Sequence, residues 1–583
     1  MPSAQSPSGG AFKAKVEEIV RHQTDLADRP YSVVLRIQLA GAYKAAGYPD
    51  LAAGEAYKAL LLIDEVVQDG EFHEEAISAA ISDATSATTC DIAIKPTIIG
   101  PSSNVECRCI SSPRDPDVEA DEAEGVARAA TCWSHSAYSI LIGSLIHCGS
   151  LRSANDYNSR ALRACPDAVF ESYQEAIRSK VKASCESKGD VYDAADVSNY
   201  PEKGFVRREL YPWNDHEPNR YSQESIEFLN TELSQVAPRL EVKVASLPVL
   251  STDNKSSKSP DSEESVTYVN QLGVFAKEDI GAGEEILKEK SLLTAVSRLR
   301  DSYCDACSAP LPKTDGSSGD STEGTTILDC EECNEVFFCS EDCHDLAQES
   351  YHPSLCGVNV EQKVSASEAA DALYSLLLIR ALALAETQSE HPLDLKEVRY
   401  IWGDYHSQNL DDAWAADDSF GSIAQTLPFT FEANVVRPLN ILEKMDVNIF
   451  EESHRYSPWV FNTLYAKFRG TASARQGPDG RPEIGAVHPL WCLANHSCDP
   501  NVAWEWQGSI RFWTREKLVE WDGRDPDRRP GILKGEEVLS HYCDIRLPVK
   551  ERREWAVGAL GGLCMCPRCV WEEAKEEGLE KSV

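Results

Sequence analysis

Eight residues able to bind a metal ion lie between positions 304 and 356, in four closely spaced pairs. The pairs are Cys304 with Cys307, Cys330 with Cys333, Cys339 with Cys343, and His352 with Cys356. Two ligands three or four positions apart can bind one ion from a turn, and their short spacing keeps the entropy cost of closing the site low. Eight ligands satisfy two tetrahedral zinc ions, which would supply folding energy to a segment with few aliphatic residues.

A second group of thiols occurs in "LCMCPRCVW", residues 563 to 571. It contains Cys564, Cys566 and Cys569. A structural zinc site has four ligands, so one more residue from elsewhere in the chain is required. The next cysteine upstream is Cys543, but spacing alone does not identify the fourth ligand.

The cellular compartment decides how the 20 cysteines are interpreted. The opening residues MPSAQSPSGGAFKAK contain no apolar stretch typical of a signal peptide, and no apolar run is long enough to span a membrane. We therefore expect a nuclear or cytoplasmic protein without a membrane segment. In such a reducing compartment, closely spaced cysteines indicate metal binding more often than disulfides.

Length and charge limit the domain organisation and the partners. A chain of 583 residues with 42% apolar residues is too long for one core, so we expect about two to four folded domains. The net charge of -38 repels nucleic acid and anionic lipid and attracts basic partners such as Lys/Arg-rich tails. The same charge can also serve solubility alone, and both interpretations stay open.

The N-terminal part shows helical periodicity with an internal repeat. Residues 39–64 predict two antiparallel helices, and an offset of 102 positions aligns Leu39 with Leu141, Gly41 with Gly143, Gly47 with Gly149, Ala52 with Ala154, Ala59 with Ala161, and Leu60 with Leu162. Three periods of about 34 residues make this offset, and the two stretches resemble tetratricopeptide repeats. Residues 96–125 predict a long loop, so we expect a short or degenerate array, with a generic helical bundle as the alternative.

Further along the chain, a polar segment separates the helical part from a region of strands. Residues 250–265, "LSTDNKSSKSPDSEES", predict a linker, so a new domain is expected to begin directly after it. Residues 268–295 alternate apolar and polar positions on both sides of Gly281-Ala282-Gly283, which predicts a strand, a turn and a strand. Residues 365–386 predict a long buried helix.

The order of the metal-ligand pairs, with the aromatic pair Phe337-Phe338 before Cys339, resembles the MYND zinc finger. Two further segments follow it: "LANHSCDPN" (493–501) and "GEEVLSHYCD" (535–544). Together with the strands at 268–295 and the cysteines at 564–569, they resemble the SET and MYND family of protein lysine methyltransferases over about residues 266–575.

The resemblance implies an α+β fold in which a β-rich SET domain is split by the MYND finger and a helical insertion. The expected domains are a helical tetratricopeptide-like region (1–200), a connecting segment and linker (201–265), the first part of the SET domain (266–298), the MYND finger (304–356), a helical insertion (357–480), the SET core (481–548), and a post-SET zinc segment (549–575).

The resemblance also implies the ligand sets of three zinc ions. In the MYND family the pairs alternate, which implies Cys304, Cys307, Cys339 and Cys343 on one ion and Cys330, Cys333, His352 and Cys356 on the other. In the SET family the cysteine of the NHSC segment joins the three post-SET cysteines. Cys498 is thereby implied as the fourth ligand of Cys564, Cys566 and Cys569.

The family further implies a binding site for S-adenosylmethionine and a catalytic tyrosine. The cofactor residues implied are Asn495 and His496, a backbone loop at Asn270, Leu272 and Gly273, and Tyr542, which is also the catalytic residue. Two departures from the family pattern are Gln271, where a glycine is usual, and Gly562, where an aromatic residue is common. Phe512, Trp513 and Tyr465 are candidate channel residues, with ordinary core positions as the alternative.

The sequence thus predicts an S-adenosylmethionine-dependent protein-lysine N-methyltransferase with three zinc ions, acting on a basic, lysine-containing protein that is a histone or another substrate. The MYND finger and the helical repeats are expected to bind peptides, and direct nucleic-acid binding is disfavoured by the acidity. The alternative is a catalytically inactive scaffold that binds proteins in transcriptional or chromatin regulation, which Gln271 and Gly562 favour.

Overall fold

The protein is described by a computed structural model over residues 8–86, 120–248, 268–296, 302–312, 327–360, 368–403, 405, 425–477, 482–560 and 562–580. The chain folds into two compact units. The first combines Met1–Asn214 with Tyr405–Thr463, and the second combines Asp215–Asp404 with Leu464–Val583. Among the described residues, no helix has the length and apolar character needed to cross a membrane.

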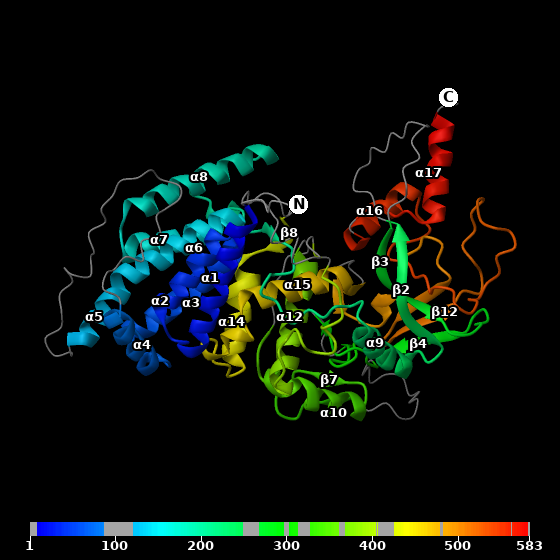
Figure 1. Cartoon of the computed structure of the whole chain (residues 1–583), viewed down its shortest axis with the longest axis horizontal. Coiled ribbons are helices and arrows are strands. Elements are labelled where there is room, and N and C mark those ends of the chain that lie inside the picture. Colours follow the sequence, from blue (N-terminus) through cyan, green and yellow to red (C-terminus); the bar gives the residue numbers. More distant parts are fainter. Residues whose placement is uncertain are drawn as a thin grey trace, which may run out of the picture. The chain divides into compact units, whose positions relative to one another are not determined.

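The first unit is almost entirely helical (Figure 1). Its helices are α1 (Ser8–Asp28), α2 (Val33–Ala45), α3 (Pro49–Val67), α4 (His73–Ser86), α5 (Ala120–Arg128), α6 (Ser134–Cys148), α7 (Leu151–Ala164), α8 (Ala168–Lys188) and α14 (Arg437–Lys444), with the π-helical turns η2 (Ala129–Trp133) and η6 (Glu432–Val436) and the 3₁₀ turns η3 (Val197–Asn199) and η7 (Glu451–His454). Helix α15 (Pro458–Thr471) begins in this unit, and its last residues belong to the second.

Small residues place α3 at the centre of this unit. Ala52, Ala53, Ala56 and Ala59 are fully buried, and α3 packs against both α2 and α6. Side chains this small allow helix backbones to approach closely. The pairs α2–α3 and α6–α7 recur at the offset of 102 residues found in the sequence, while the tetratricopeptide architecture itself stays a prediction.

The loop predicted at 96–125 is wrong in its last part. Residues 120–125 are the beginning of helix α5, and residues 96–119 lie outside the described part of the chain. Asp121 and Glu122 occupy the first turn of α5, where carboxylates favour a helix, and Glu124 forms an ion pair with Arg128 one turn later. The acidic composition that suggested a loop here stabilises a helix start.

The predicted insertion at 357–480 is divided between the two units. Residues 405–463 belong to the first unit, where β8 (Gln425–Phe429) pairs antiparallel with β1 (Gly204–Arg207). The remainder belongs to the second unit and includes α12 (Ala369–Gln388), the long buried helix expected at 365–386.

The second unit contains several small antiparallel sheets and short helices. Its strands are β2 (Leu240–Pro248), β3 (Tyr268–Ala276), β4 (Glu285–Glu289), β5 (Thr294–Val296), β6 (Leu328–Asp329), β7 (Phe337–Phe338), β9 (Ser473–Gln476), β10 (Pro482–Ala486), β11 (Val502–Trp506) and β12 (Ile510–Thr514). Its other helices are α9 (Gln223–Val236), α10 (Glu341–Ser350), α11 (His352–Leu355), the 3₁₀ turn η8 (Trp491–Leu493), α16 (Val549–Leu560) and α17 (Pro567–Glu580).

The sheets of the second unit, apart from the β6-β7 pair, contribute to a common apolar core. Their strand orders are β11-β12-β4, β5-β10-β9, β2-β3 and β6-β7. Val274, Leu287, Val502 and Phe512 from four strands and Val538 from the segment before Tyr542 are buried in a single cluster. This core fixes the strand ends on which the candidate site is built.

The domain start expected at 266 differs from the observed organisation. β2, which precedes the predicted linker, pairs with β3 over its whole length, from Leu240 opposite Ala276 to Pro248 opposite Tyr268. The second unit therefore begins at Asp215, and the linker predicted at 250–265 falls in residues outside the described part. A polar connection between two paired strands has the same composition as a linker between domains.

Candidate active site and metal centres

Three segments distant in sequence meet at one place in the second unit. Ser497 N–H donates to the carbonyl of Ser540 at 2.8 Å, and Ser540 N–H donates to the carbonyl of Asn495 at 2.8 Å, so the NHSC segment lies parallel to the segment before Tyr542. Val538 N–H donates to the carbonyl of Val274 on β3 at 2.7 Å. Backbone hydrogen bonds thus connect the segment before Tyr542 to both the NHSC segment and β3.

The side chain of Asn495 hydrogen-bonds to both of the other segments and so stabilises the place where the three cross. Its Nδ2 donates to the carbonyl of Leu272 at 3.0 Å and to Oε1 of Glu537 at 2.6 Å. A Cβ on Gly273 would lie 2.5 Å from the same Glu537 oxygen, closer than atoms can approach. Glycine at position 273 therefore leaves room for the Glu537 carboxylate that bonds Asn495. Burial raises the pKa of Glu537, and the Asn495 hydrogen bond opposes that rise.

Tyr542 and His496 are oriented by each other. Backbone N–H of Tyr542 donates to Nδ1 of His496 at 3.0 Å, which places the imidazole proton on Nε2, where Cys498 Sγ lies 3.4 Å away. The hydroxyl of Tyr542 donates to the carbonyl of Ala494 at 2.8 Å. Burial raises the pKa of Tyr542, so its hydroxyl stays protonated, and burial lowers the pKa of His496 to about 4.

Two positioning residues were not identified from the sequence. Asn501 donates from Nδ2 to the carbonyl of Glu537 and accepts Leu539 N–H, both at 2.8 Å. Glu289 is buried at the end of β4 and accepts the N–H groups of Leu490 and Trp491 at 3.1 and 2.8 Å, which fixes the turn before Asn495. Burial raises the pKa of Glu289 to about 7. Asn501 is the last residue of the motif "LANHSCDPN", so its position in the motif could have marked it as a site residue. Glu289 lies in no motif, so the sequence offered no sign of its role.

Other candidate residues lie apart from this crossing or inside the core. Asn270 belongs to strand β3, not to a loop, and its carbonyl accepts a hydrogen bond from Tyr221 at 2.8 Å. Phe512 and Tyr465 are buried, and Phe512 packs against Trp491 with ring centroids 6.1 Å apart. Trp513 is half-buried on β12.

Gln271 and Gly562, the two departures from the family pattern, both lie in the described part of the chain. Gln271 pairs with Ala245 in the β2–β3 ladder, and Gly562 is buried two residues before Cys564. Gln271 is therefore accommodated in a regular strand.

Four thiols gather beside the crossing. The Sγ atoms of Cys498, Cys564, Cys566 and Cys569 all lie within 4.8 Å of one another, including 3.4 Å between Cys498 and Cys569. This is the set that the family resemblance implies. Cys543 also lies near, because His496, Cys498 and Cys543 form an overlapping group with the same spacing. Four thiols in one cluster fit the donor set of a structural zinc ion.

Buried arginines surround this thiol cluster. Arg552 donates to Cys569 Sγ at 3.5 Å and pairs with Glu572, while Arg568 donates to the carbonyls of Cys498 and Ile545, both at 2.9 Å. Both guanidinium groups are almost fully buried. A zinc ion with four thiolates carries two net negative charges, which these cations offset.

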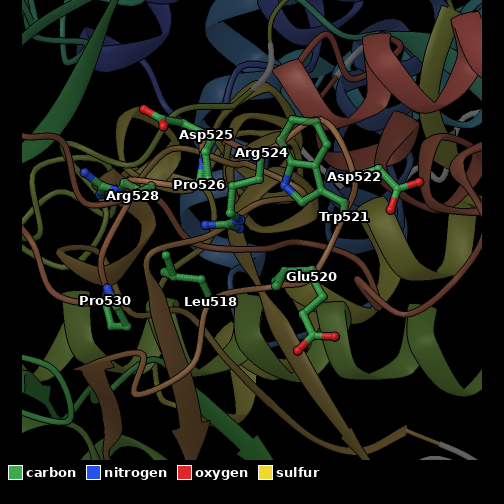
Figure 2. Close-up of a pocket in the computed structure, with 10 residues that line it drawn as sticks. Leu518, Glu520, Trp521, Asp522, Arg524, Asp525, Pro526, Arg528 and Pro530 are labelled. Carbon is green, nitrogen blue, oxygen red and sulfur yellow. The ribbon is translucent and has the colours of Figure 1, made fainter.

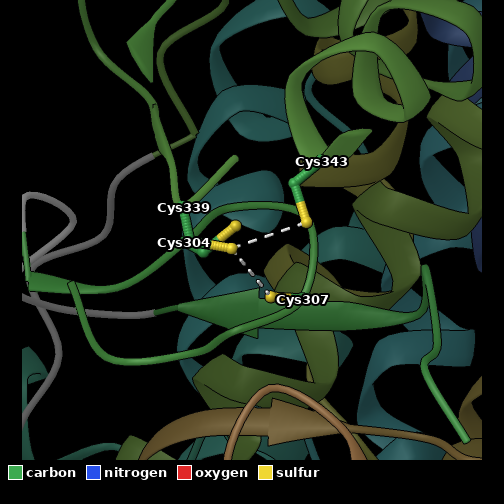
Figure 3. A group of neighbouring side chains, drawn as sticks. All are labelled: Cys304, Cys307, Cys339 and Cys343. Atoms are coloured by element: carbon green, nitrogen blue, oxygen red, sulfur yellow. Dashed lines mark hydrogen bonds between the residues drawn. The ribbon is translucent and has the colours of Figure 1, made fainter. Parts of the chain in front are cut away.

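The finger region contains the other two clusters. Cys304, Cys307, Cys339 and Cys343 form one group (Figure 3), and Cys330, Cys333, His352 and Cys356 form the other, each with ligand atoms within 4.8 Å. Ser308 and Asn334, the residues after each CxxC pair, have φ angles of 60° and 54° and close matching turns. Both donor sets fit tetrahedral zinc.

A further group, His216, His391 and Asp394, lies outside these clusters. The two imidazole rings stack face to face with centroids 3.7 Å apart and planes 4° from parallel. A metal ion binds a histidine in the plane of its imidazole ring. Because the rings of His216 and His391 are stacked with nearly parallel planes, one ion cannot lie in both planes. This group is therefore a stacked histidine pair with Asp394 bonded to His216 Nδ1 at 2.8 Å.

The chain resembles known proteins over this region. A family model described as SET domain matches residues 271–519. The chain is similar to the N-lysine methyltransferase SMYD2 of Gallus gallus, with 23% identity over 287 residues that make up 48% of this chain and 53% of that protein. It is also similar to the SET domain and MYND-type zinc finger protein 6 of Schizosaccharomyces pombe, with 32% identity over 88 residues, 15% of this chain and 16% of that protein.

A SET and MYND domain-containing protein of Dictyostelium discoideum is 27% identical over 100 residues, 17% of each chain. The chain thus spans about half the length of the first of these relatives and about a sixth of the other two. The matched SET residues end at 519, so Tyr542 and the post-SET cysteines lie beyond the match.

Proposed function

Because the chain belongs to the SET and MYND domain family, we propose that it is an S-adenosylmethionine-dependent protein-lysine N-methyltransferase. The observation that supports this most is the crossing of β3, the NHSC segment and the segment before Tyr542. It brings Gly273, Asn495 and Tyr542 together from three parts of the chain.

The residues proposed to hold the cofactor are Asn495, His496, Leu272 and Gly273, with Tyr542 beside them and Asn270 at the start of the same strand. When bound, S-adenosylmethionine supplies the methyl group. The absence of a side chain at Gly273 leaves room for Glu537 and Asn495 beside the backbone of β3, which keeps the three segments of the proposed cofactor site together. Asn495 has its amide engaged by Leu272 and Glu537, so its role is to hold the backbone in position.

The substrate amine must arrive without its proton, because only the neutral nitrogen has a lone pair for the displacement. Burial of a lysine side chain lowers its pKa, and a neighbouring positive charge lowers it further. The hydroxyl of Tyr542 is kept protonated by burial and is anchored on the carbonyl of Ala494. From that place it can orient the amine through a hydrogen bond while its ring excludes water.

Three zinc ions are proposed as structural elements. Cys498, Cys564, Cys566 and Cys569 would hold one ion beside the crossing, and the two finger clusters would hold the others. Because Cys498 is two residues after His496, the first ion would order the cofactor segment directly. The substrate is proposed to be a basic, lysine-containing protein, since a chain with net charge -38 attracts cationic segments.

The test is cofactor binding followed by methyl transfer. We expect the zinc-loaded full chain to bind S-adenosylmethionine in a calorimeter and to transfer a labelled methyl group to lysine in proteins of a lysate, identified by mass spectrometry. Asn495→Ala should weaken cofactor binding, whereas Asn199→Ala, an exposed substitution in the first unit, should leave it unchanged. A folded, zinc-loaded chain that binds no cofactor would instead be a scaffold.

A further inference from the structure

A long loop without helix or strand follows β12 and lies almost entirely beyond the part of the chain that the SET family model matches. It runs from Leu518 to Pro530, whereas the match ends at 519. We refer to these residues as the latch loop. It has few backbone hydrogen bonds of its own, such as Arg524 N–H to Trp521 O at 3.2 Å and Arg528 N–H to Asp525 O at 3.2 Å. Its position is therefore determined by its side-chain contacts.

Those contacts lead to the candidate active site. Trp521 Nε1–H donates to Asp499 Oδ2 at 3.1 Å, and Arg524 forms an ion pair with the other oxygen of the same carboxylate. Asp499 directly follows Cys498, and its own N–H donates to Ser497 Oγ at 3.1 Å. The latch loop thus holds the turn that carries His496 and Cys498 from outside.

The latch loop also contacts the segment before Tyr542 and helix α17. Arg528 pairs with Glu536, next to the Glu537 that holds Asn495. Trp521 contacts Trp571 on α17 with ring centroids 6.0 Å apart, and Asp522 pairs with Lys575 on α17 at 2.6 Å. One loop therefore bridges the NHSC turn, the segment before Tyr542 and the helix that carries Cys569.

The latch loop also lines a hollow of about 450 Å³. Figure 2 shows the carboxylates of Glu520, Asp522 and Asp525 pointing away from one another. Because they do not converge, the hollow offers no cation site. Of the polar side chains that line it, Trp521 and Arg524 bond Asp499, Arg528 pairs with Glu536, and Asp522 pairs with Lys575.

We propose that the latch loop positions the cofactor-binding turn, with Arg524 and Trp521 as positioning residues that act through Asp499. This inference rests on the proposed function, because the turn is assigned to the cofactor there. Without the latch, Asp499 would lose both of its partners on the loop, and the turn would be held by the contacts of Ser497, His496 and Cys498. A more mobile turn would lose cofactor affinity while the zinc ion stayed bound.

The test compares Arg524→Gln and Trp521→Phe with Arg529→Gln, an exposed arginine of the same loop, in the zinc-loaded full chain. We expect Arg524→Gln to raise the Kd for S-adenosylmethionine about tenfold, as loss of a hydrogen bond to a charged group does. Trp521→Phe keeps the aromatic contact with Trp571 and removes only the donor to Asp499, so we expect a smaller rise. Arg524→Lys, which keeps the charge, should bind with an intermediate Kd.

Two readouts separate positioning from loss of structure. Zinc content and melting temperature should match the parent protein, and the KM for cofactor should rise while kcat at saturating cofactor stays the same. Amide hydrogen exchange at residues 495–502 should become about tenfold faster in Arg524→Gln than in Arg529→Gln. Equal Kd values and equal exchange in these two variants would overturn the inference. If the parent chain binds no cofactor, the proposed function fails, and the exchange measurement alone decides on the latch.

Discussion

At the scale of single residues, Tyr542 offers the most direct test of the chemistry. Its hydroxyl bonds the carbonyl of Ala494, and its backbone N–H bonds His496, so removing the hydroxyl leaves the backbone arrangement intact. We expect Tyr542→Phe to lower the rate of methyl transfer about 10²-fold or more with less than about a threefold change in cofactor Kd. Single-turnover kinetics and calorimetry measure the two quantities.

The matched control is Tyr192→Phe, a tyrosine of the first unit, which should change neither quantity. An unaltered transfer rate in Tyr542→Phe would remove this hydroxyl from the proposed mechanism.

Glu289 makes stability depend on pH. Its pKa is about 7 in the folded protein against an ordinary value of 4.5, so between these values the folded state holds a proton that the unfolded chain releases. Its contribution to stability is therefore greatest below pH 4.5, declines as pH rises to about 7, and is constant above. The decline amounts to on the order of 3 kcal/mol.

Glu289→Gln has no such titration. We expect the difference in unfolding free energy between the parent and this variant to change steadily from pH 5 to pH 7 and then to level off. Taking the difference cancels the pH dependence of zinc binding, which both proteins share. Parallel stability curves across this range would show that Glu289 is not protonated in the folded protein.

Some site residues could be predicted from the sequence, and others could not. The metal-ligand pairs of the finger follow from short spacings within a few residues, and the NHSC segment follows from the family resemblance. Glu289 and Arg524 act on residues that lie 201 positions downstream and 25 positions upstream of them, and a lone carboxylate or guanidinium has no local pattern. Such partners become visible only when the fold brings the segments together.

At the scale of elements, the post-SET segment and the NHSC turn depend on each other through Cys498. Its Sγ lies 3.9 Å from Cys564 and 3.4 Å from Cys569. We expect Cys498→Ser to lower the zinc content from three ions toward two and to weaken cofactor binding at least tenfold, because three thiolates hold zinc less tightly than four. Elemental analysis after dialysis and calorimetry measure both effects.

Cys492 provides a matched control six residues away. It is a half-buried thiol that donates to the carbonyl of Thr471 at 3.4 Å and belongs to none of the metal clusters among the described residues. Cys492→Ser keeps a donor at that place and should retain all three zinc ions. Full zinc content in both variants would show that Cys498 is not a ligand.

Element positions were predicted well where one periodic pattern runs uninterrupted, as in α12 and in the strands around Gly283. The prediction failed at α5 because its carboxylates were read as a loop signal. The pairing of β2 with β3 could not be foreseen, since polar residues between two strands look the same as a linker between domains.

At the scale of the whole molecule, the first unit is built from two separate parts of the chain. Arg36 is fully buried and donates to the carbonyl of Phe450 at 3.2 Å and to Ser453 Oγ at 3.1 Å. Lys58, also buried, lies 3.3 Å from the carbonyl of Tyr456. These cations on α2 and α3 also pair with Glu55, but part of their hydrogen bonding comes from acceptors more than 390 positions later.

A fragment of residues 1–214 should consequently not fold stably. It lacks β8, the partner of β1, and removes the acceptors of Arg36 and Lys58 on Phe450, Ser453 and Tyr456, at a cost of about 1–3 kcal/mol for each group. We expect no cooperative unfolding transition for this fragment in circular dichroism. Joining residues 425–471 to it through a flexible Gly/Ser linker should restore one. A cooperative transition in the short fragment would contradict the two-part organisation.

The separation of 66 positions between Cys498 and Cys564 sets an order of assembly. Cys564, Cys566 and Cys569 are separated by only a few residues, so they can bind a metal ion early in folding. Binding of Cys498 to the same ion closes a much longer loop and is therefore slower. During refolding, metal uptake would therefore precede formation of the active site. A chain in which Cys564, Cys566 and Cys569 alone held a zinc ion would still be incomplete, and the arrival of Cys498 would complete it.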